Sequence, residues 1–144
     1  MKGLIQRVSE ACVYVNQEKI GEINTGILLL LGVERNDSED HVDRMLHKIL
    51  NYRIFPDSDG KMNQSLLDIQ GELLVVSQFT LAADTKKGLR PGFSAAAEPA
   101  LAENLYLQFV DKASQQVSTA TGRFAADMQV SLINDGPVTF HIDI

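Results

Sequence analysis

The chain has 144 residues, of which 44% are hydrophobic and 22% charged, a composition typical of one ordinary globular domain over residues 1–144. The longest apolar run, residues 27–31, is too short to cross a bilayer, and the N-terminus lacks a signal-peptide pattern, so we expect a cytoplasmic protein. A net charge of −6 and a pI of about 4.9 disfavour nonspecific binding to nucleic acid.

Three extended segments and one helix are expected in the first third of the chain. Alternating or continuous apolar residues predict strands, which cover residues 2–16, 20–23 and 27–33. Residues 17–19 are expected to turn the first strand into the second. Asp37 or Ser38 can cap a following helix, because apolar residues recur at helical spacing from Val42 to Leu50.

The remaining two thirds predict further strands and a second helix. Extended patterns cover residues 53–55, 72–79, 128–133 and 138–144. A helix is expected to begin at Pro99, with a buried stripe formed by Leu101, Leu105, Phe109, Ala113 and Val117. Residues 82–97 are expected to form a loop long enough to carry function. This order predicts an α/β fold in which a mixed, strongly curved, barrel-like sheet packs with two amphipathic helices.

Two short polar segments directly follow strand-like apolar sequence. Residues 77–81 (Ser-Gln-Phe-Thr-Leu) and residues 134–139 (Asn-Asp-Gly-Pro-Val-Thr) place hydroxyls, amides and backbone where a strand should end. Rigid scaffolds present chemistry at such points, so both segments are candidate sites. Taken alone, each is most simply a turn, the second one of the hairpin type between two strands.

Histidine and cysteine residues form no recognisable site in the sequence. His41 and His47 are six residues apart on the expected helix, which places them on different sides, and His141 falls on the polar side of the last strand. All three are expected at the surface. Cys12 lies in an apolar stretch and is expected to be a small buried hydrophobic residue. We therefore expect no metal and no cofactor.

The chemistry that remains is that of hydroxyls and backbone groups. The sequence has no Gly-x-Ser-x-Gly elbow, no phosphate-binding loop and no dinucleotide fingerprint. If the strand ends near Ser77, the turn through Gln78 leaves main-chain N–H groups unpaired, and such donors stabilise a developing oxyanion. Thr80 could be a nucleophile, but no nearby His or Lys is evident to take its proton, so it could instead hold a water or a substrate amine.

Together the two segments resemble the signature motifs of the D-aminoacyl-tRNA deacylases, formerly called D-tyrosyl-tRNA deacylases. Matching blocks in the same order extend the resemblance over essentially all 144 residues: residues 5–8, 30–33, 48–55, 88–94 and 121–128. Either motif alone is moderately specific, and the combination is very specific. Ala125, where this family often has Gly, is a small departure that lies outside both motifs.

The resemblance implies an activity and a set of site residues. It implies a cytoplasmic homodimer that hydrolyses the ester joining a D-amino acid to the 3′-terminal adenosine of tRNA, and that also removes glycine from mischarged tRNA. The implied residues are Phe79 and Thr80 at the reaction centre, Ser77, Gln78, Met128, Asn134, Gly136 and Pro137 in substrate binding, and Arg7 in support across the dimer interface. The aminoacylated 3′ end of tRNA is the implied partner; DNA and membranes are not.

The resemblance also implies how chirality is read. The Gly136–Pro137 bond would be cis and would enter the partner subunit's pocket, where the Gly136 carbonyl would fill the direction that an L side chain needs. Selectivity would then come from an obstacle to the wrong enantiomer, which glycine, having no side chain, also escapes. Phe79 would contact the scissile carbonyl through its backbone. The absence of a base beside Thr80 favours attack led by the tRNA's own 2′-hydroxyl. The basic loop residues Lys86, Lys87 and Arg90 are expected near the phosphates.

Two other functions remain open on the sequence alone. The first is a catalytically silent module of the same fold that binds RNA ends, and the intact segment 77–81 argues for the enzyme instead. The second is an esterase for small D-amino acid esters, which would turn over its substrate without tRNA.

Overall fold

The sheet is built around its first strand. The structure is a computed structural model that describes residues 1–86 and 88–144. Its elements in chain order are β1 (Lys2–Val15), β2 (Glu18–Ile23), β3 (Gly26–Gly32), α1 (Glu39–Asn51), β4 (Phe55–Pro56), β5 (Met62–Gln64), β6 (Glu72–Ser77), the 3-10 helix η1 (Phe79–Ala82), α2 (Pro99–Ser114), β7 (Thr119–Thr121) and β8 (Gln129–Asp143). β1 is antiparallel to β2, β3 and β8. Lys2 pairs with both Gly32 of β3 and Asp143 of β8, so β1 lies inside the sheet.

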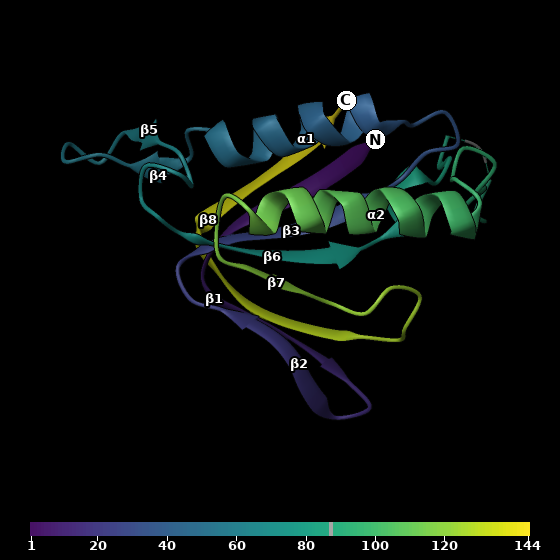
Figure 1. Ribbon diagram of the computed structural model, residues 1–144, viewed down its shortest axis with the longest axis horizontal. Coiled ribbons are helices and arrows are strands. Elements are labelled where there is room, and N and C mark those ends of the chain that lie inside the picture. Colours follow the sequence, from purple (N-terminus) through teal and green to yellow (C-terminus); the bar gives the residue numbers. More distant parts are fainter. Residues whose placement is uncertain (87) are drawn as a thin grey trace.

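The other half of the sheet is parallel. β6 runs parallel to β3, and β7 runs parallel to β6, so the connections through α1 and α2 are crossovers. Crossovers of one hand that step in one direction across a sheet place their helices on the same face. Figure 1 shows α1 and α2 covering one face of the sheet, while the β4–β5 hairpin projects beyond the end of α1. No helix among the described residues has both the length and the apolar character needed to cross a bilayer.

The sheet curls until its outer strands β2 and β7 approach each other. A Cβ placed on Gly21 of β2 would lie 2.6 Å from the main-chain oxygen of Thr121 in β7, so only glycine permits this approach. The result is a mixed, nearly closed, barrel-like sheet with two helices. The fold class predicted from the sequence is confirmed.

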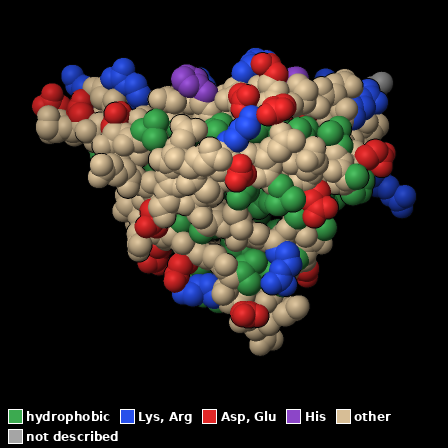
Figure 2. Space-filling view, in the orientation of Figure 1, with side chains coloured by type: hydrophobic (Ala, Val, Ile, Leu, Met, Phe, Trp, Pro, Cys, Tyr) green, Lys and Arg blue, Asp and Glu red, His purple; other side chains and the backbone are tan. Residues whose placement is uncertain are grey.

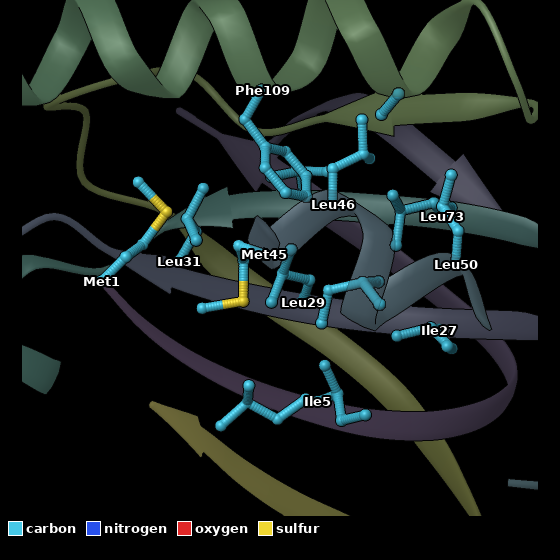
Figure 3. Packing of buried hydrophobic residues seen from close by; sticks show 14 of the residues in the cluster. Met1, Ile5, Ile27, Leu29, Leu31, Met45, Leu46, Leu50, Leu73 and Phe109 are labelled. Atoms are coloured by element: carbon cyan, nitrogen blue, oxygen red, sulfur yellow. The ribbon is translucent and has the colours of Figure 1, made fainter. Parts of the chain in front are cut away.

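Hydrophobic residues cover both faces of the central strands. Ile27, Leu29 and Leu31 of β3 pack with the helices in the larger core, and Leu28 belongs to a second, smaller cluster on the opposite face. Figure 3 shows Phe109 of α2 and Met45 and Leu46 of α1 meeting the first of these surfaces. The expectation that residues 27–33 form a strand buried on both faces is therefore confirmed.

Several element boundaries differ from those predicted. The first turn lies at Asn16 and Gln17, which both have positive φ (50° and 67°), and β2 already begins at Glu18, so the turn predicted at 17–19 is misplaced. Two consecutive positive φ angles suit a tight hairpin. β6 ends at Ser77 rather than at residue 79, because the chain then enters η1.

The second helix buries three of the five residues predicted for its stripe, Leu105, Phe109 and Ala113, and two that were not predicted. Its buried residues are Ala102, Leu105, Tyr106, Phe109 and Ala113. Leu101 is only half-buried, and the helix ends at Ser114, before Val117. The strand β7 that follows was not predicted; its three residues are too few to show a periodicity.

The prediction of a turn at residues 134–137 is wrong, because these residues lie within the single long strand β8. β8 pairs with β1 from Lys2 to Tyr14 with two irregularities in register. Gln6 pairs with Thr139, and Val8 pairs with Asn134. One residue of β1 therefore faces four residues of β8, and residues 135–138 form a wide bulge opposite Arg7.

Candidate active site

A largely apolar cavity of about 530 Å³ lies beside the end of β6. Three segments form most of its wall: residues 76–79 at the end of β6, the beginning of α2 with Ala102 and Tyr106, and residues 124–128 before β8. Of the predicted site residues, Ser77, Gln78, Phe79 and Met128 line this cavity together. Thr80 follows directly in the chain.

The main chain of residues 78–80 carries unused hydrogen-bond donors. The N–H of Gln78 donates to the carbonyl of Leu31 at 2.8 Å and anchors the segment to β3. The N–H groups of Phe79 and Thr80 have no hydrogen-bond acceptor within residues 1–86 and 88–144. Two adjacent free N–H groups at the rim of an apolar cavity are suited to stabilise an oxyanion.

The hydroxyl of Thr80 has a donor beside it rather than a base. The side-chain amide of Gln78 donates to Oγ1 of Thr80 at 2.6 Å. An amide NH₂ cannot accept a proton, and nothing else among the described side chains is hydrogen-bonded to this hydroxyl. The geometry therefore supplies no activation of Thr80 as a nucleophile.

Tyr106, which lines the cavity, is hydrogen-bonded to the main chain of β6. Its hydroxyl donates to the carbonyl of Val75 at 3.0 Å, and burial raises the pKa of Tyr106 to about 12, so the hydroxyl stays protonated. The N–H of Gly122 donates to the same carbonyl at 3.0 Å. Tyr106 was not predicted as a site residue, because in the sequence it is one more apolar position of a helix.

The segment before β8 contributes a strained residue to the cavity wall. Ala125 has φ of 58°, in the left-handed region that favours glycine. Glycine adopts this conformation without strain, which gives a physical reason for the expectation of Gly at this position. Met128 lies next to it in the wall, and its sulfur accepts the N–H of Arg123 at 3.3 Å.

Ala125→Gly is expected to stabilise the protein by about 0.5 kcal/mol. The left-handed conformation costs alanine about 1–2 kcal/mol, and the added freedom of glycine in the unfolded chain offsets part of that gain. Urea unfolding checks this, with Ala126→Gly as the matched control. Ala126 lines the same wall without a positive φ, so its replacement should destabilise by about 0.5–1 kcal/mol. Equal destabilisation by both variants would contradict the claim that the left-handed conformation strains Ala125.

The bulge at residues 135–138 is held at its base by two side chains. Oδ1 of Asn134 accepts the N–H of Val138 at 3.0 Å, and its Nδ2 donates to the hydroxyl of Thr139 at 2.9 Å. Arg7 donates from Nε to the carbonyl of Asp135 at 3.0 Å and from Nη1 to the carbonyl of Ile54 at 2.7 Å. Arg7 and Asn134 thus position the bulge within their own chain.

Gly136 and Pro137 lie at the tip of this bulge. The bond between them is cis, as predicted, and Gly136 has φ of 139°. Both residues are exposed, and neither lines the cavity formed by residues 76–79 and 124–128 of the same chain. Within one chain, the two sequence motifs therefore do not share a site. Residues 77–79 line the cavity, whereas Gly136 and Pro137 are exposed outside it.

The basic loop is only partly described. Lys86 and Arg90 are exposed, whereas Lys87 lies outside the described residues. On the face drawn in Figure 2, basic side chains are interspersed with acidic ones. A contact with phosphate groups would therefore depend on a few local side chains rather than on a broad basic surface.

The histidines and the cysteine considered in the sequence form no site in the described structure. His41 closes a capping box at the start of α1, where its Nδ1 accepts the N–H of Ser38 at 3.2 Å, and His47 and His141 are exposed. Cys12 is half-exposed rather than buried, which corrects the prediction. Within the described ranges, no three His, Cys, Asp or Glu side chains are grouped so as to hold a metal ion.

The chain is similar to known deacylases over its whole length. The family model described as D-Tyr-tRNA(Tyr) deacylase matches residues 4–143. A D-aminoacyl-tRNA deacylase of Pseudoalteromonas translucida (strain TAC 125) is 61% identical over 145 residues, with all of both chains covered. A D-aminoacyl-tRNA deacylase of Haemophilus influenzae (strain PittEE) is 58% identical over 144 residues, again over both full chains.

Solved structures agree in fold. The "c-Myc DNA Unwinding Element Binding Protein" superposes with a TM-score of 0.95 at 40% identity and covers 100% of this chain and 99% of its own. A "probable eukaryotic D-amino acid tRNA deacylase" superposes with a TM-score of 0.77 at 17% identity, covering 99% and 98%, and shows the shared fold alone. From the family model and the full-length relatives, the chain belongs to the D-Tyr-tRNA(Tyr) deacylase family.

Proposed function

We propose that this protein is a D-aminoacyl-tRNA deacylase, which hydrolyses the ester between a D-amino acid and the 3′-terminal adenosine of tRNA. The observation that carries the proposal is the pair of free N–H groups of Phe79 and Thr80 at the cavity rim, in a chain of this family. As a tRNA-dependent enzyme it would act in the cytoplasm. It requires no metal or cofactor in this scheme.

The reaction is an acyl transfer to water. The ester lies in the cavity, where Ser77, Gln78 and Met128 contact the substrate, and the free N–H groups of Phe79 and Thr80 receive the carbonyl oxygen as it becomes an oxyanion. The nucleophile is a water directed by the 2′-hydroxyl of the terminal ribose. Thr80 lines the site without forming a covalent intermediate, because among the described residues its hydroxyl is hydrogen-bonded only to the Gln78 amide, which is a donor and not a base.

Thr80→Ala is expected to retain hydrolysis of D-tyrosyl-tRNA within about tenfold of wild type. The variant removes the hydroxyl and leaves the main-chain N–H, which is the group assigned to the oxyanion. Single-turnover rates measure the effect. A loss of more than about 10³-fold, with unchanged stability and tRNA binding, would reinstate Thr80 as the nucleophile.

Chirality is read by main chain supplied from a second subunit. Because the Gly136–Pro137 tip is exposed and lies outside its own chain's cavity, a homodimer can insert it into the partner's cavity. The Gly136 carbonyl then occupies the direction of an L side chain. D-substrates avoid it, and so does glycine on mischarged tRNA. Arg7 and Asn134 set the position of the tip, and the interface completes the site.

Two alternative functions predict different assay results. D-tyrosyl-tRNA, L-tyrosyl-tRNA and D-tyrosine methyl ester are incubated with catalytic amounts of protein. The proposal predicts rapid loss of the D-ester of tRNA only. A silent RNA-end-binding module would leave all three at the buffer rate, and a small-ester esterase would hydrolyse the methyl ester equally well.

The name of one structural relative raises DNA as a further ligand. That protein is described as binding a DNA unwinding element. The net charge of −6 argues against DNA here, since duplex binding depends on neutralising many phosphates. The tRNA acceptor end, held mainly at one cavity, needs fewer such contacts.

A further inference from the structure

Two exposed aromatic rings stand side by side at the cavity mouth. Phe79 lines the cavity and is 58% exposed, and Phe93 of the following loop is 39% exposed. Their ring centroids are 5.1 Å apart with an interplanar angle of 53°. Large apolar side chains are normally buried, so an exposed aromatic pair continuous with a reaction cavity indicates a surface that a ligand covers.

The backbone that carries Phe93 is held in place. Asp84 and Gly92 exchange two main-chain hydrogen bonds of 2.7 and 3.0 Å immediately before it. After it, the N–H of Arg35 donates to Ala95 and the N–H of Ala97 donates to Val33, both at 3.0 Å. The ring is therefore presented by a fixed segment, so that little ordering is required when a ligand binds.

We propose that Phe93, together with Phe79, forms a stacking platform for the base that precedes the terminal adenosine of tRNA. This inference rests on the proposed function. If the ester reacts beside Phe79, the terminal adenosine occupies the cavity and the next nucleotide lies at its mouth. Aromatic side chains hold unpaired bases by stacking, which is how proteins commonly bind single-stranded RNA.

Charge in the same loop fits this occupant. Lys86 and Arg90 are exposed, and neither forms an ion pair with any acidic group among the described residues. Asp84 is the nearby acid in the loop, where its Oδ1 accepts the N–H of Lys86 at 2.9 Å. A stacked base would bring its phosphate to these cations, so that the platform fixes the base and the loop fixes the backbone.

The test uses a short single-stranded RNA ending in cytidine-cytidine-adenosine, without an amino acid, in which 2-aminopurine replaces the base before the terminal adenosine. Binding to the wild-type homodimer is expected to quench the probe through stacking. Phe93→Ala should weaken binding about tenfold and abolish the quenching, and Phe93→Trp should restore both. The same Ala variant should raise KM for D-tyrosyl-tRNA about tenfold, with a smaller change in kcat.

Leu107→Ala is the matched control, because Leu107 is a 54% exposed apolar residue on α2 that does not line the cavity. It should leave probe binding unchanged. The platform is wrong if Phe93→Ala binds and quenches the probe like wild type, or if its only effect is to dissociate the dimer. Since the probe carries no ester, failure of the platform is distinguished from failure of the deacylase proposal, which the hydrolysis assay alone decides.

Discussion

Gly136→Ala is expected to lower hydrolysis of D-aminoacyl-tRNA about 10²-fold, because misplacing a positioning element by roughly 1 Å has effects of this order. Gly136 has φ of 139°, which L side chains rarely adopt. An added Cβ would lie 2.6 Å from Cγ2 and 2.9 Å from the nitrogen of Val138. The bulge must therefore change shape, and the carbonyl assigned to the chirality filter moves with it. Rates on D- and L-tyrosyl-tRNA measure the loss.

Gly60→Ala is the control for this substitution. Gly60 also has a positive φ, of 77°, but a Cβ there meets no heavy atom within 4 Å. It lies in the turn between β4 and β5, so its replacement should reduce stability by about 1 kcal/mol and leave activity unchanged. Retention of more than half of wild-type activity by Gly136→Ala would show that the tip does not take part in the reaction.

Asp37→Asn is expected to destabilise the fold by about 3 kcal/mol. Asp37 is buried, and its Oδ1 lies 2.8 Å from the ammonium group of Met1, while its Oδ2 accepts the N–H of Glu34 at 2.7 Å. The same ammonium group donates to the carbonyl of Ile144 at 2.8 Å. Asparagine removes the charge and replaces one acceptor by a donor, so that the longer 3.3 Å contact with Glu34 is the remaining carboxylate contact of the ammonium group among the described residues.

Urea unfolding at matched protein concentration measures this effect, because the stability of the proposed homodimer would depend on protein concentration. Asp40→Asn is the control. Asp40 is exposed and lies 3.8 Å from Arg44 on the same helix, so its loss should cost less than about 1 kcal/mol. Equal effects of the two substitutions on the free energy of unfolding would contradict the larger contribution to stability assigned to the Met1–Asp37 ion pair.

The strands and helices were largely predictable where a periodic pattern is long. Residues 27–33 were predicted as a strand buried on both faces, because a short, continuous apolar run bounded by turn residues is typical of such a strand. The bulge in β8 was not predictable. Asn134 and Gly136 are typical turn residues, and only the pairing partner β1, about 130 residues away in sequence, keeps the chain extended through them.

The site was predictable from motifs only in part. Residues 77–79 and Met128 were named from the sequence and do line one cavity. Tyr106 was missed, because a single hydroxyl on a helix gives no signal until β6 places the Val75 carbonyl opposite it. The free N–H groups of Phe79 and Thr80 were expected only on the condition that the strand ends near Ser77, and tertiary pairing rather than local sequence decides where β6 ends.

The central claim is that the Gly136–Pro137 tip of one subunit completes the cavity of the other, and subunit mixing tests it most directly. Ala126→Phe would block the cavity and Gly136→Ala would distort the tip, so each homodimer alone should be inactive. Refolding the two variants together gives heterodimers with one intact cavity facing one intact tip. We predict recovery of about a quarter of wild-type D-tyrosyl-tRNA hydrolysis. A mixture no more active than its components would show that each chain uses its own tip.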